Sequence, residues 1–224
     1  SNAGNFSLNI TCFLSGVDVA RDVYSGSNNS NPSGFTVMGN NAYFAANDGS
    51  NGVELWKSDG TVAGTTLLKD INPGSGGSSP SNFIVMNGVL YFTANDGSTG
   101  TELWKSDGTA AGTTQVKDIY TGASNSASPQ YLVVSGSTLY FQATDATNGT
   151  ELWKSDGTSG GTSIVKDINS GAGSSNPTNL ILMAGTLYFS ATDGAGTNSG
   201  FELWKSDGTS GGTTQVKDIY AGAL

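Results

Sequence analysis

Glu102-Leu103-Trp104-Lys105-Ser106-Asp107-Gly108-Thr109, ELWKSDGT, is one of four identical copies of an eight-residue stretch in this chain. The other copies begin at Glu54, Glu151 and Glu202, so consecutive copies are 48, 49 and 51 residues apart. Similarity at a nearly constant period of this size is typical of repeat architectures, in which each unit is one supersecondary element stacked on its neighbours. The sequence of one unit therefore predicts the fold of the array.

Each unit has the pattern of four short strands separated by tight turns. The apolar run Phe83–Met86 is followed by Asn87-Gly88, a pair typical of two-residue hairpin turns because both residues tolerate a positive φ. A second apolar run, a turn rich in Gly and Asp, the ELWKS strand, the DGTAAG turn and a TTQVKDI strand complete the unit. A polar connector with one proline follows; these prolines are Pro32, Pro80, Pro129 and Pro177.

The predicted fold class is all-β: a β-propeller of four-stranded antiparallel blades, with four repeats and an extra N-terminal strand pair. The N-terminal VDVARDVYSG resembles the unit end QVKDIYTG, with Arg21 where lysine falls elsewhere. Asn5–Leu14 alternates like a strand that could pair with Val17–Val23. The alternatives are part of a larger propeller and a ring completed by a second chain, so the sequence leaves both monomer and homodimer open.

We expect a single repeat domain over residues 4–224, preceded by an expression scar at residues 1–3. Its predicted parts are the N-terminal strands at 4–32 and repeats at 33–80, 81–129, 130–177 and 178–224.

Two features of the unit predict how the sheets pack. Leu103 and Trp104 are adjacent, so they lie on opposite faces of one strand, and we expect the tryptophans in the core between blades rather than as platforms for sugars. The last strand ends in adjacent Lys and Asp, charges expected on an exposed outer edge that must not pair with other strands.

Composition and charge exclude several classes of function. The net charge of −9 disfavours nucleic acid as a partner. The absence of histidine excludes nucleophile systems that depend on His and the usual zinc sites. Cys12 is the single cysteine, expected as a small buried apolar residue, and no apolar run approaches the length of a membrane span. Nearly all charges recur in each repeat, whereas an active site needs unlike groups converging at one place, so we predict no enzyme.

Four turns carry candidate calcium ligands. Asp48, Asp96, Asp145 and Asp193 lie in turns rich in Gly, Asn and Thr, whose oxygens suit calcium. Each turn has one carboxylate, whereas calcium takes six to eight oxygens, several of them charged. The favoured interpretation is therefore that these residues cap their turns and that the protein needs no cofactor.

The recurring ELWKSDGT, Gly-Thr and VKDI segments resemble the bacterial ELWxxDGT repeat family, also called hyalin-like, over residues 17–220. The resemblance implies a secreted or surface-associated protein without established catalytic residues. It marks as positions that define the scaffold Glu102, Leu103, Trp104, Asp107, Gly108, Thr109 and their counterparts.

Three functions follow as hypotheses. The first is a non-enzymatic extracellular module that binds a glycan or a surface protein at several repeats, because linked weak sites gain avidity. The second is a structural spacer of a surface protein. The third and most distant is a glycoside-acting enzyme with two carboxylates. The ligand and the biological process are not encoded in any recognisable motif.

Overall fold

The computed structural model describes residues 21–26, 28–123, 125–194 and 200–219. The first sheet contains β1 (Ser33–Met38), β2 (Asn41–Asn47), β3 (Val53–Ser58) and β4 (Thr66–Lys69). The second contains β5 (Ser81–Met86), β6 (Val89–Asn95), β7 (Thr101–Ser106) and β8 (Thr114–Lys117). The third contains β9 (Gln130–Ser135), β10 (Thr138–Asp145), β11 (Gly149–Ser155) and β12 (Ser163–Lys166). The fourth contains β13 (Thr178–Met183), β14 (Thr186–Ala191), β15 (Glu202–Ser206) and β16 (Thr214–Lys217).

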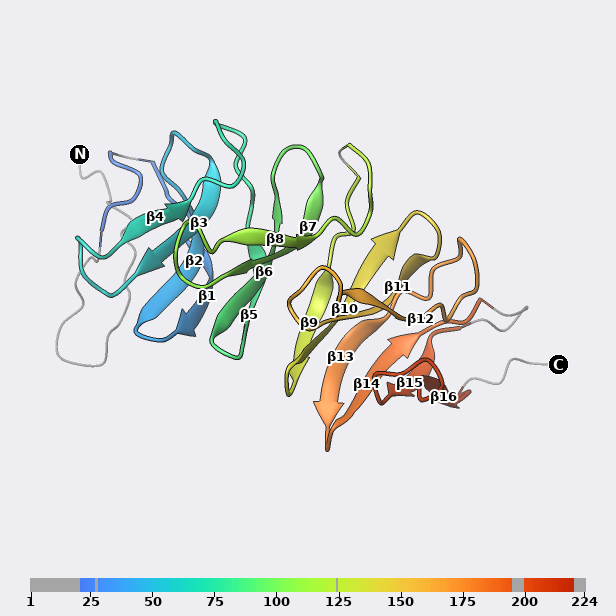
Figure 1. Ribbon diagram of the computed structural model, residues 1–224. Helices are drawn as coiled ribbons and strands as arrows, with labels where there is room; N and C mark the ends of the chain where they lie inside the picture. Colours follow the sequence, from blue (N-terminus) through green and yellow to red (C-terminus); the bar gives the residue numbers. More distant parts are fainter. Residues whose placement is uncertain (1–20, 27, 124, 195–199, 220–224) are drawn as a thin grey trace. The chain divides into compact units, whose positions relative to one another are not determined.

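Each repeat forms one four-stranded antiparallel sheet whose strands pair in chain order (Figure 1). This confirms the predicted all-β architecture of four-stranded blades. The Asn87-Gly88 hairpin is also as predicted: it joins β5 to β6, and both residues have positive φ. Cys12 and the expected strand at Asn5–Leu14 lie outside the described residues. Within the described part of the chain, no helix is long and apolar enough to cross a membrane.

The chain forms two compact units. The first contains the residues up to Gly100 together with Trp104–Thr114, and the second contains Thr101–Leu103 and the residues from Gln115 onward. In the first unit, Leu55 and Leu68 of the first sheet pack in one core cluster with Phe92 and Trp104 of the second. In the second unit, the third and fourth sheets share an equivalent cluster, formed by Leu152, Val165, Ile168, Phe189 and Trp204 among others. Sheet-on-sheet packing therefore supplies the core of each unit.

Successive residues of the ELWKS strand point to opposite faces of their sheet, so they contact different neighbouring segments. Leu55 lies on the face of its sheet that meets the next repeat, while Trp56 lies on the opposite face, against Val23 and Phe44. All four tryptophans are buried, as expected of a core between sheets. We call the leucine-bearing side of a sheet its exit face and the tryptophan-bearing side its entry face.

The outer Lys-Asp pair is not the exposed edge that the sequence predicts. Lys69 and Asp70 are both half-buried, and the Lys69 ammonium donates to the Thr113 carbonyl oxygen of the second repeat at 2.7 Å. Lys117 and Lys166 make the equivalent bond to the repeats that follow them. The prediction is wrong for the first three repeats, where this lysine is half-buried and bonds to the following repeat; in the fourth repeat Lys217 and Asp218 are exposed.

Every first strand begins with a β-bulge. The bulge residues have left-handed backbones and are Gly34, Asn82, Tyr131 and Asn179. Asn and Gly tolerate this conformation, whereas a bulky side chain in it is strained.

Replacing Tyr131 by asparagine is expected to raise the free energy of unfolding by about 0.5–1 kcal/mol, because it relieves part of the left-handed strain at φ 55°. Tyr131 is 40% exposed, so its removal sacrifices little burial. Urea denaturation measures the change, and the reciprocal Asn82→Tyr should be destabilising. Equal stability of Y131N and wild type would contradict the strain argument.

Candidate functional site

The glutamate that begins each motif holds the connector that follows its sheet. Glu54 is fully buried, and its carboxylate accepts hydrogen bonds from the backbone N–H groups of Ile71 (2.9 Å), Asn72 (3.1 Å) and Ser78 (2.8 Å). The Ser78 hydroxyl donates a fourth bond at 2.5 Å. Both ends of the connector are thereby held by one side chain near the start of β3.

The third repeat has the same arrangement. Glu151 accepts from the backbone of Ile168, Asn169 and Ser175 and from the Ser175 hydroxyl. The two connectors differ in sequence, INPGSGGSS against INSGAGSSN, but present the same set of donors. The connector shape therefore depends on the glutamate and is shared by repeats whose exposed connector residues differ.

The connector lies against the β2–β3 turn of its own repeat. A Cβ at Gly52 in this turn would collide with the backbone of Gly77 in the connector, and Gly149 is similarly close to Gly173. The Asn72 amide donates to the Gly77 carbonyl oxygen at 2.9 Å, and its side chain also lies against Gly97 of the second repeat. The turn and the connector thus form one surface at the same end of the sheet, which we call the connector end.

The second repeat lacks one donor to its glutamate. Ala127 stands where the other two connectors have Ser78 and Ser175, so Glu102 loses the hydroxyl bond and accepts from the N–H groups of Ile119 (3.0 Å) and Ala127 (2.9 Å). Burial raises the pKa of Glu102 to about 7, opposed by these backbone donors, with the nearby Asp118 charge adding to the rise. Burial also raises the pKa of Glu54 and of Glu151 against the opposing effect of their donors.

Replacing Ala127 by serine is expected to stabilise the protein by about 1–2 kcal/mol at pH 8, because the new hydroxyl donates to an ionised carboxylate. The Glu102 pKa of about 7 in the folded protein exceeds the ordinary value of 4.5, so the folded state binds this proton more tightly. The Glu102 contribution to stability is therefore fully present below about pH 4.5 and is lost as the pH rises through about 7.

Urea denaturation of A127S and wild type from pH 4 to pH 8 measures this difference. The free energy of unfolding of A127S should exceed that of wild type most at high pH. It should also fall less steeply as the pH rises, because the new hydroxyl lowers the pKa of Glu102 in the folded state. Ser78→Ala in the first repeat is the matched control, with the opposite sign. A gain that does not depend on pH would contradict the assignment to Glu102.

The candidate calcium ligands bind their own turns. The Asp96 carboxylate accepts from the backbone N–H groups of Ser98 (2.8 Å) and Thr99 (2.7 Å), and Asp48 and Asp145 cap their turns in the same way. Partial burial opposes ionisation, but these donors outweigh it and hold the pKa of Asp48 and of Asp96 below the usual value. Asp193 is exposed and lies close to residues 195–199, which the structure does not describe.

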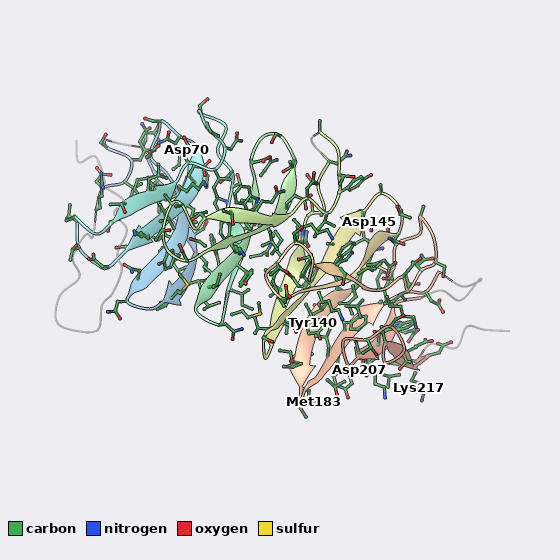
Figure 2. The ribbon with its side chains drawn as sticks, in the orientation of Figure 1. Asp70, Tyr140, Asp145, Met183, Asp207 and Lys217 are labelled. Atoms are coloured by element: carbon green, nitrogen blue, oxygen red, sulfur yellow. The ribbon has the colours of Figure 1, made fainter. Side chains whose placement is uncertain are left out.

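These aspartates are not brought together with other metal-ligating side chains. Figure 2 labels Asp145 on its turn at the end of β10. Among the described residues, no group of three or more His, Cys, Asp or Glu side chains could hold a metal ion. The turns of Asp48, Asp96 and Asp145 therefore offer single carboxylates that already accept hydrogen bonds from backbone amides.

Adding millimolar calcium, or millimolar chelator, is expected to change the midpoint of thermal unfolding by less than about 1 °C. A site filled to 100 times its Kd would add about 2.7 kcal/mol, or roughly 5–10 °C for a chain of this size. Differential scanning calorimetry distinguishes these outcomes, and Asp96→Asn should melt alike with and without calcium. A calcium-dependent rise abolished by D96N would restore the metal hypothesis.

The opposite end of each sheet carries the contact between consecutive repeats. The DGT turn of the second repeat lies against Tyr43 and Lys57 of the first: the Lys57 ammonium donates to the Gly108 carbonyl oxygen at 3.2 Å. A Cβ at Gly108 would collide with the Tyr43 hydroxyl. Burial, assisted by the charge of Asp107, raises the pKa of Tyr43.

The third and fourth repeats make the same contact between the DGT turn of one repeat and the tyrosine and lysine of the repeat before it. Lys154 donates to the Gly208 carbonyl oxygen at 2.9 Å, Lys166 donates to that of Thr213 at 2.8 Å, and Tyr140 covers Gly208. Burial, again helped by the charge of the turn aspartate, raises the pKa of Tyr140; Figure 2 labels Tyr140 and Asp207. A tyrosine and two lysines on the exit face therefore bind the DGT turn of the next repeat.

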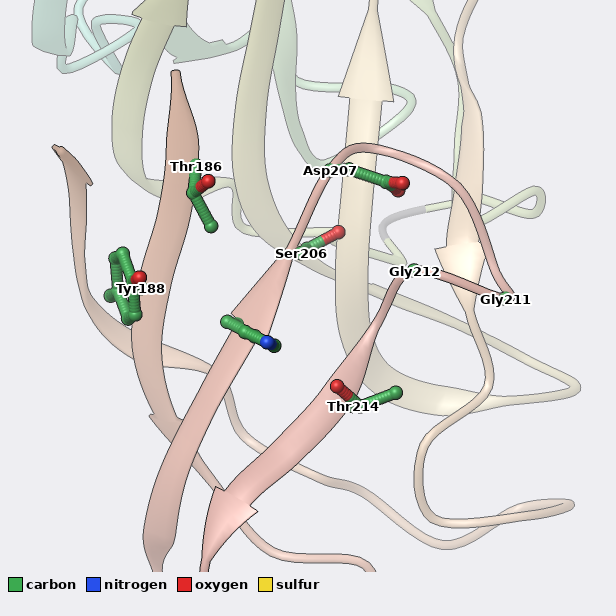
Figure 3. A pocket seen from close by; sticks show the side chains of 8 residues that line it. Thr186, Tyr188, Ser206, Asp207, Gly211, Gly212 and Thr214 are labelled. Atoms are coloured by element: carbon green, nitrogen blue, oxygen red, sulfur yellow. The ribbon is translucent and has the colours of Figure 1, made fainter. Parts of the chain in front are cut away.

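A cavity of about 400 Å³ lies on the fourth sheet (Figure 3). Its walls come from β14, β15, β16 and the DGT turn, and they include Tyr188, Lys205, Asp207 and Thr214. Tyr188 and Lys205 are the counterparts of Tyr140 and Lys154 in the sequence repeat. The lining is polar, and its one carboxylate, Asp207, is bonded to Thr209 of its own turn.

Comparisons with known proteins show the fold and not the family. No protein-family model matches the chain. No curated protein matches it either. Among solved structures, it is similar to puromycin hydrolase at 16% identity with a TM-score of 0.53, covering 85% of this chain and 30% of the hydrolase. It is also similar to a structure from a study of two prolyl endopeptidases, at 14% identity with a TM-score of 0.49, covering 79% of this chain and 24% of that one.

The likeness to puromycin hydrolase is to a β-propeller domain, so the four sheets are blades of the β-propeller type. The chain spans less than a third of the length of the proteins that it matches.

Proposed function

We propose that this chain is a non-catalytic extracellular module that binds a glycan or a surface protein at the connector ends of several repeats. The observation that supports the proposal is the buried glutamate. Glu54 and Glu151 hold connectors of different sequence with the same set of hydrogen bonds, so variable exposed residues are presented on a constant support. Binding sites commonly lie on loops that a rigid scaffold positions.

In the first three repeats, the residues that recur already make contacts within the protein. The glutamates bind connectors, the turn aspartates bind amides and the outer lysines bind carbonyl groups of the next repeat, and the tryptophans are buried in all four repeats. The exposed residues that vary lie largely in the connectors, for example Ser75, Thr121 and Ser170. A ligand that distinguishes this protein from others would have to contact these positions.

The proposed location is secreted or at the cell surface, and the resemblance to ELWxxDGT repeats supports it. Several weak sites on one chain gain avidity on the order of 10²–10⁴ when a ligand can reach more than one of them. Polymeric glycans and dense surface proteins are ligands of that kind.

The experiment is a glycan array followed by titration calorimetry of the full chain with the best glycan. We expect more than one site per chain. Blocking the connectors one at a time with Ser75→Trp, Thr121→Trp and Ser170→Trp should lower the number of sites stepwise without changing the affinity of those that remain. Ser159→Trp, in an exposed turn at the opposite end of the sheet, is the matched control. Full binding by the triple variant would contradict the proposal.

The second candidate is a structural spacer, and the contacts between repeats favour it. Lys69, Lys117 and Lys166 each bond one repeat to the next, which stiffens an array whether or not it binds anything. No binding across a broad array of glycans and surface proteins, together with a stable fold, would favour the spacer over the binding module.

A further inference from the structure

The exit face of the fourth sheet is the counterpart of a surface that is covered in the other repeats. Leu203 is 38% exposed, whereas Leu55, Leu103 and Leu152 are fully buried. Val216 is 45% exposed against 6% for its counterparts in the first three repeats, and Ile219 is 71% exposed against 5–7%. The ELWKSDGT and QVKDI segments of the fourth repeat are identical to those of the second, so the difference lies in what covers them.

The polar part of this face is also open. Lys205 and Lys217 are exposed, whereas Lys154 and Lys166 donate to carbonyl groups of the following repeat. Tyr188 lines a cavity at the place where Tyr140 covers Gly208 in the preceding repeat (Figure 3). Tyr188, Lys205 and Thr214 are paired across β14, β15 and β16, so they form one patch.

The complementary part is open in the first repeat. Its DGT turn, Asp59-Gly60-Thr61, has the same internal hydrogen bonds as the others. Gly108 and Gly208 are covered by a tyrosine of the preceding repeat, but a Cβ at Gly60 would meet nothing within 4 Å. Within its own unit and among the described residues, each of these two surfaces thus lacks the partner that the same surface has between consecutive repeats.

Among the residues that the structure describes, Arg21 and Val23 cover the entry face of the first sheet. Arg21 donates to the Thr65 carbonyl oxygen at 2.7 Å and lies 6.0 Å from the Trp56 ring, and Val23 packs on Trp56. Arg21-Asp22-Val23 thus occupies the place that Lys69-Asp70-Ile71 occupies against the second repeat, and no strand among the described residues lies beside it as β3 lies beside Lys69. The exit face of a repeat carries a cation and a β-branched apolar residue at the places of Arg21 and Val23. It also carries a tyrosine, a leucine and a second lysine that this segment lacks.

We propose that the exit face of the fourth repeat binds the first repeat of a second copy of this chain, head to tail. Lys205 donates to the Gly60 carbonyl oxygen, Lys217 replaces Arg21 at Thr65, and Tyr188 covers Gly60. The occupant is inferred from continuity with the contacts between repeats, which use these groups in this order. Lys205 and Lys217 also face the exposed Asp59, so the charges are complementary although each copy carries −9.

Such a contact joins two different surfaces, so it closes into a dimer when both ends engage and otherwise extends into longer assemblies. Higher salt should favour it, because screening weakens the repulsion between two acidic chains more than it weakens close apolar contacts.

Sedimentation velocity of the full chain, from about 1 to 100 µM, tests the proposal. We expect reversible association of wild type. The exit-face variant Tyr188→Ala/Lys217→Glu and the turn variant Gly60→Asn should each weaken it at least about tenfold. Asparagine tolerates the positive φ of Gly60 but places a side chain in the contact. Circular dichroism melts confirm that the variants are folded.

Two controls are matched to these variants. Gly136→Asn adds the same side chain at another open glycine with positive φ. Ser50→Glu/Ser98→Glu adds the same two negative charges as K217E at exposed turns of the connector end. Both should associate like wild type.

A mixture gives the decisive result. The exit-face variant retains a sound first repeat, and the turn variant retains a sound exit face, so mixing them should restore one contact and yield a one-to-one heterodimer. A monomeric wild type throughout the concentration range, or association that the mixture does not restore, would overturn the proposal.

Discussion

Replacing Glu54 by alanine is expected to lower the free energy of unfolding by about 3–5 kcal/mol at neutral pH. The change leaves the N–H groups of Ile71 and Ser78 and the Ser78 hydroxyl without their acceptor in a buried place. Each buried donor left unpaired costs about 1–3 kcal/mol, and the breaking of a buried network accounts for the largest effects of single substitutions. Urea denaturation, followed by tryptophan fluorescence, measures the loss.

The fourth repeat offers the control for this prediction. Within the described residues, Glu202 accepts a hydrogen bond from Ile219 alone, at 2.8 Å, and it is less deeply buried. Glu202→Ala should therefore cost no more than about 1 kcal/mol. Equal losses at the two positions would show that the glutamate matters for packing in its own sheet and not for holding a connector.

Replacing Trp104 by alanine is the second large effect, with an expected loss of about 3–5 kcal/mol. Its indole lies in the core cluster between the first and second sheets, with Tyr43, Leu55 and Leu68. The substitution removes a large buried side chain and leaves a cavity that two stacked sheets cannot close. Chemical denaturation measures the change.

The indole nitrogen separates packing from hydrogen bonding. Trp104 Nε1 is buried without a partner, whereas Trp204 Nε1 donates to the Ala191 carbonyl oxygen at 3.0 Å. Trp104→Phe should therefore cost clearly less than Trp204→Phe, by about 1 kcal/mol, since only the latter loses a hydrogen bond. A larger cost for W104F would mean that ring size outweighs the polar contribution.

Local features of the fold were predictable because their causes are local. Asn87-Gly88 specifies a hairpin through its own backbone preferences, and Asp96 caps a turn two and three residues ahead of it. The opposite orientation of Leu103 and Trp104 follows from the strand itself. These predictions required no knowledge of any distant residue.

The role of Glu54 was missed because its partners lie 17–24 residues further along the chain. The signal was present: a carboxylate stood at a fixed place before an apolar pair in every repeat, where burial needs compensating donors. The lysines were misassigned for a similar reason, since the Thr113 carbonyl group that Lys69 binds is 44 residues away. Neither the pairing of Glu54 with its connector nor that of Lys69 with Thr113 can be predicted from the pattern of neighbouring residues.

The sequence alone determined that four identical octamers form four similar sheets, because strand alternation and turn chemistry act within each unit. Only the tertiary structure decided the environment of each copy: Leu103 is fully buried and Leu203 is 38% exposed, although both occur in the same eight letters. The physical reason is that burial belongs to a pair of faces, and a residue is withdrawn from water only where a second surface covers it.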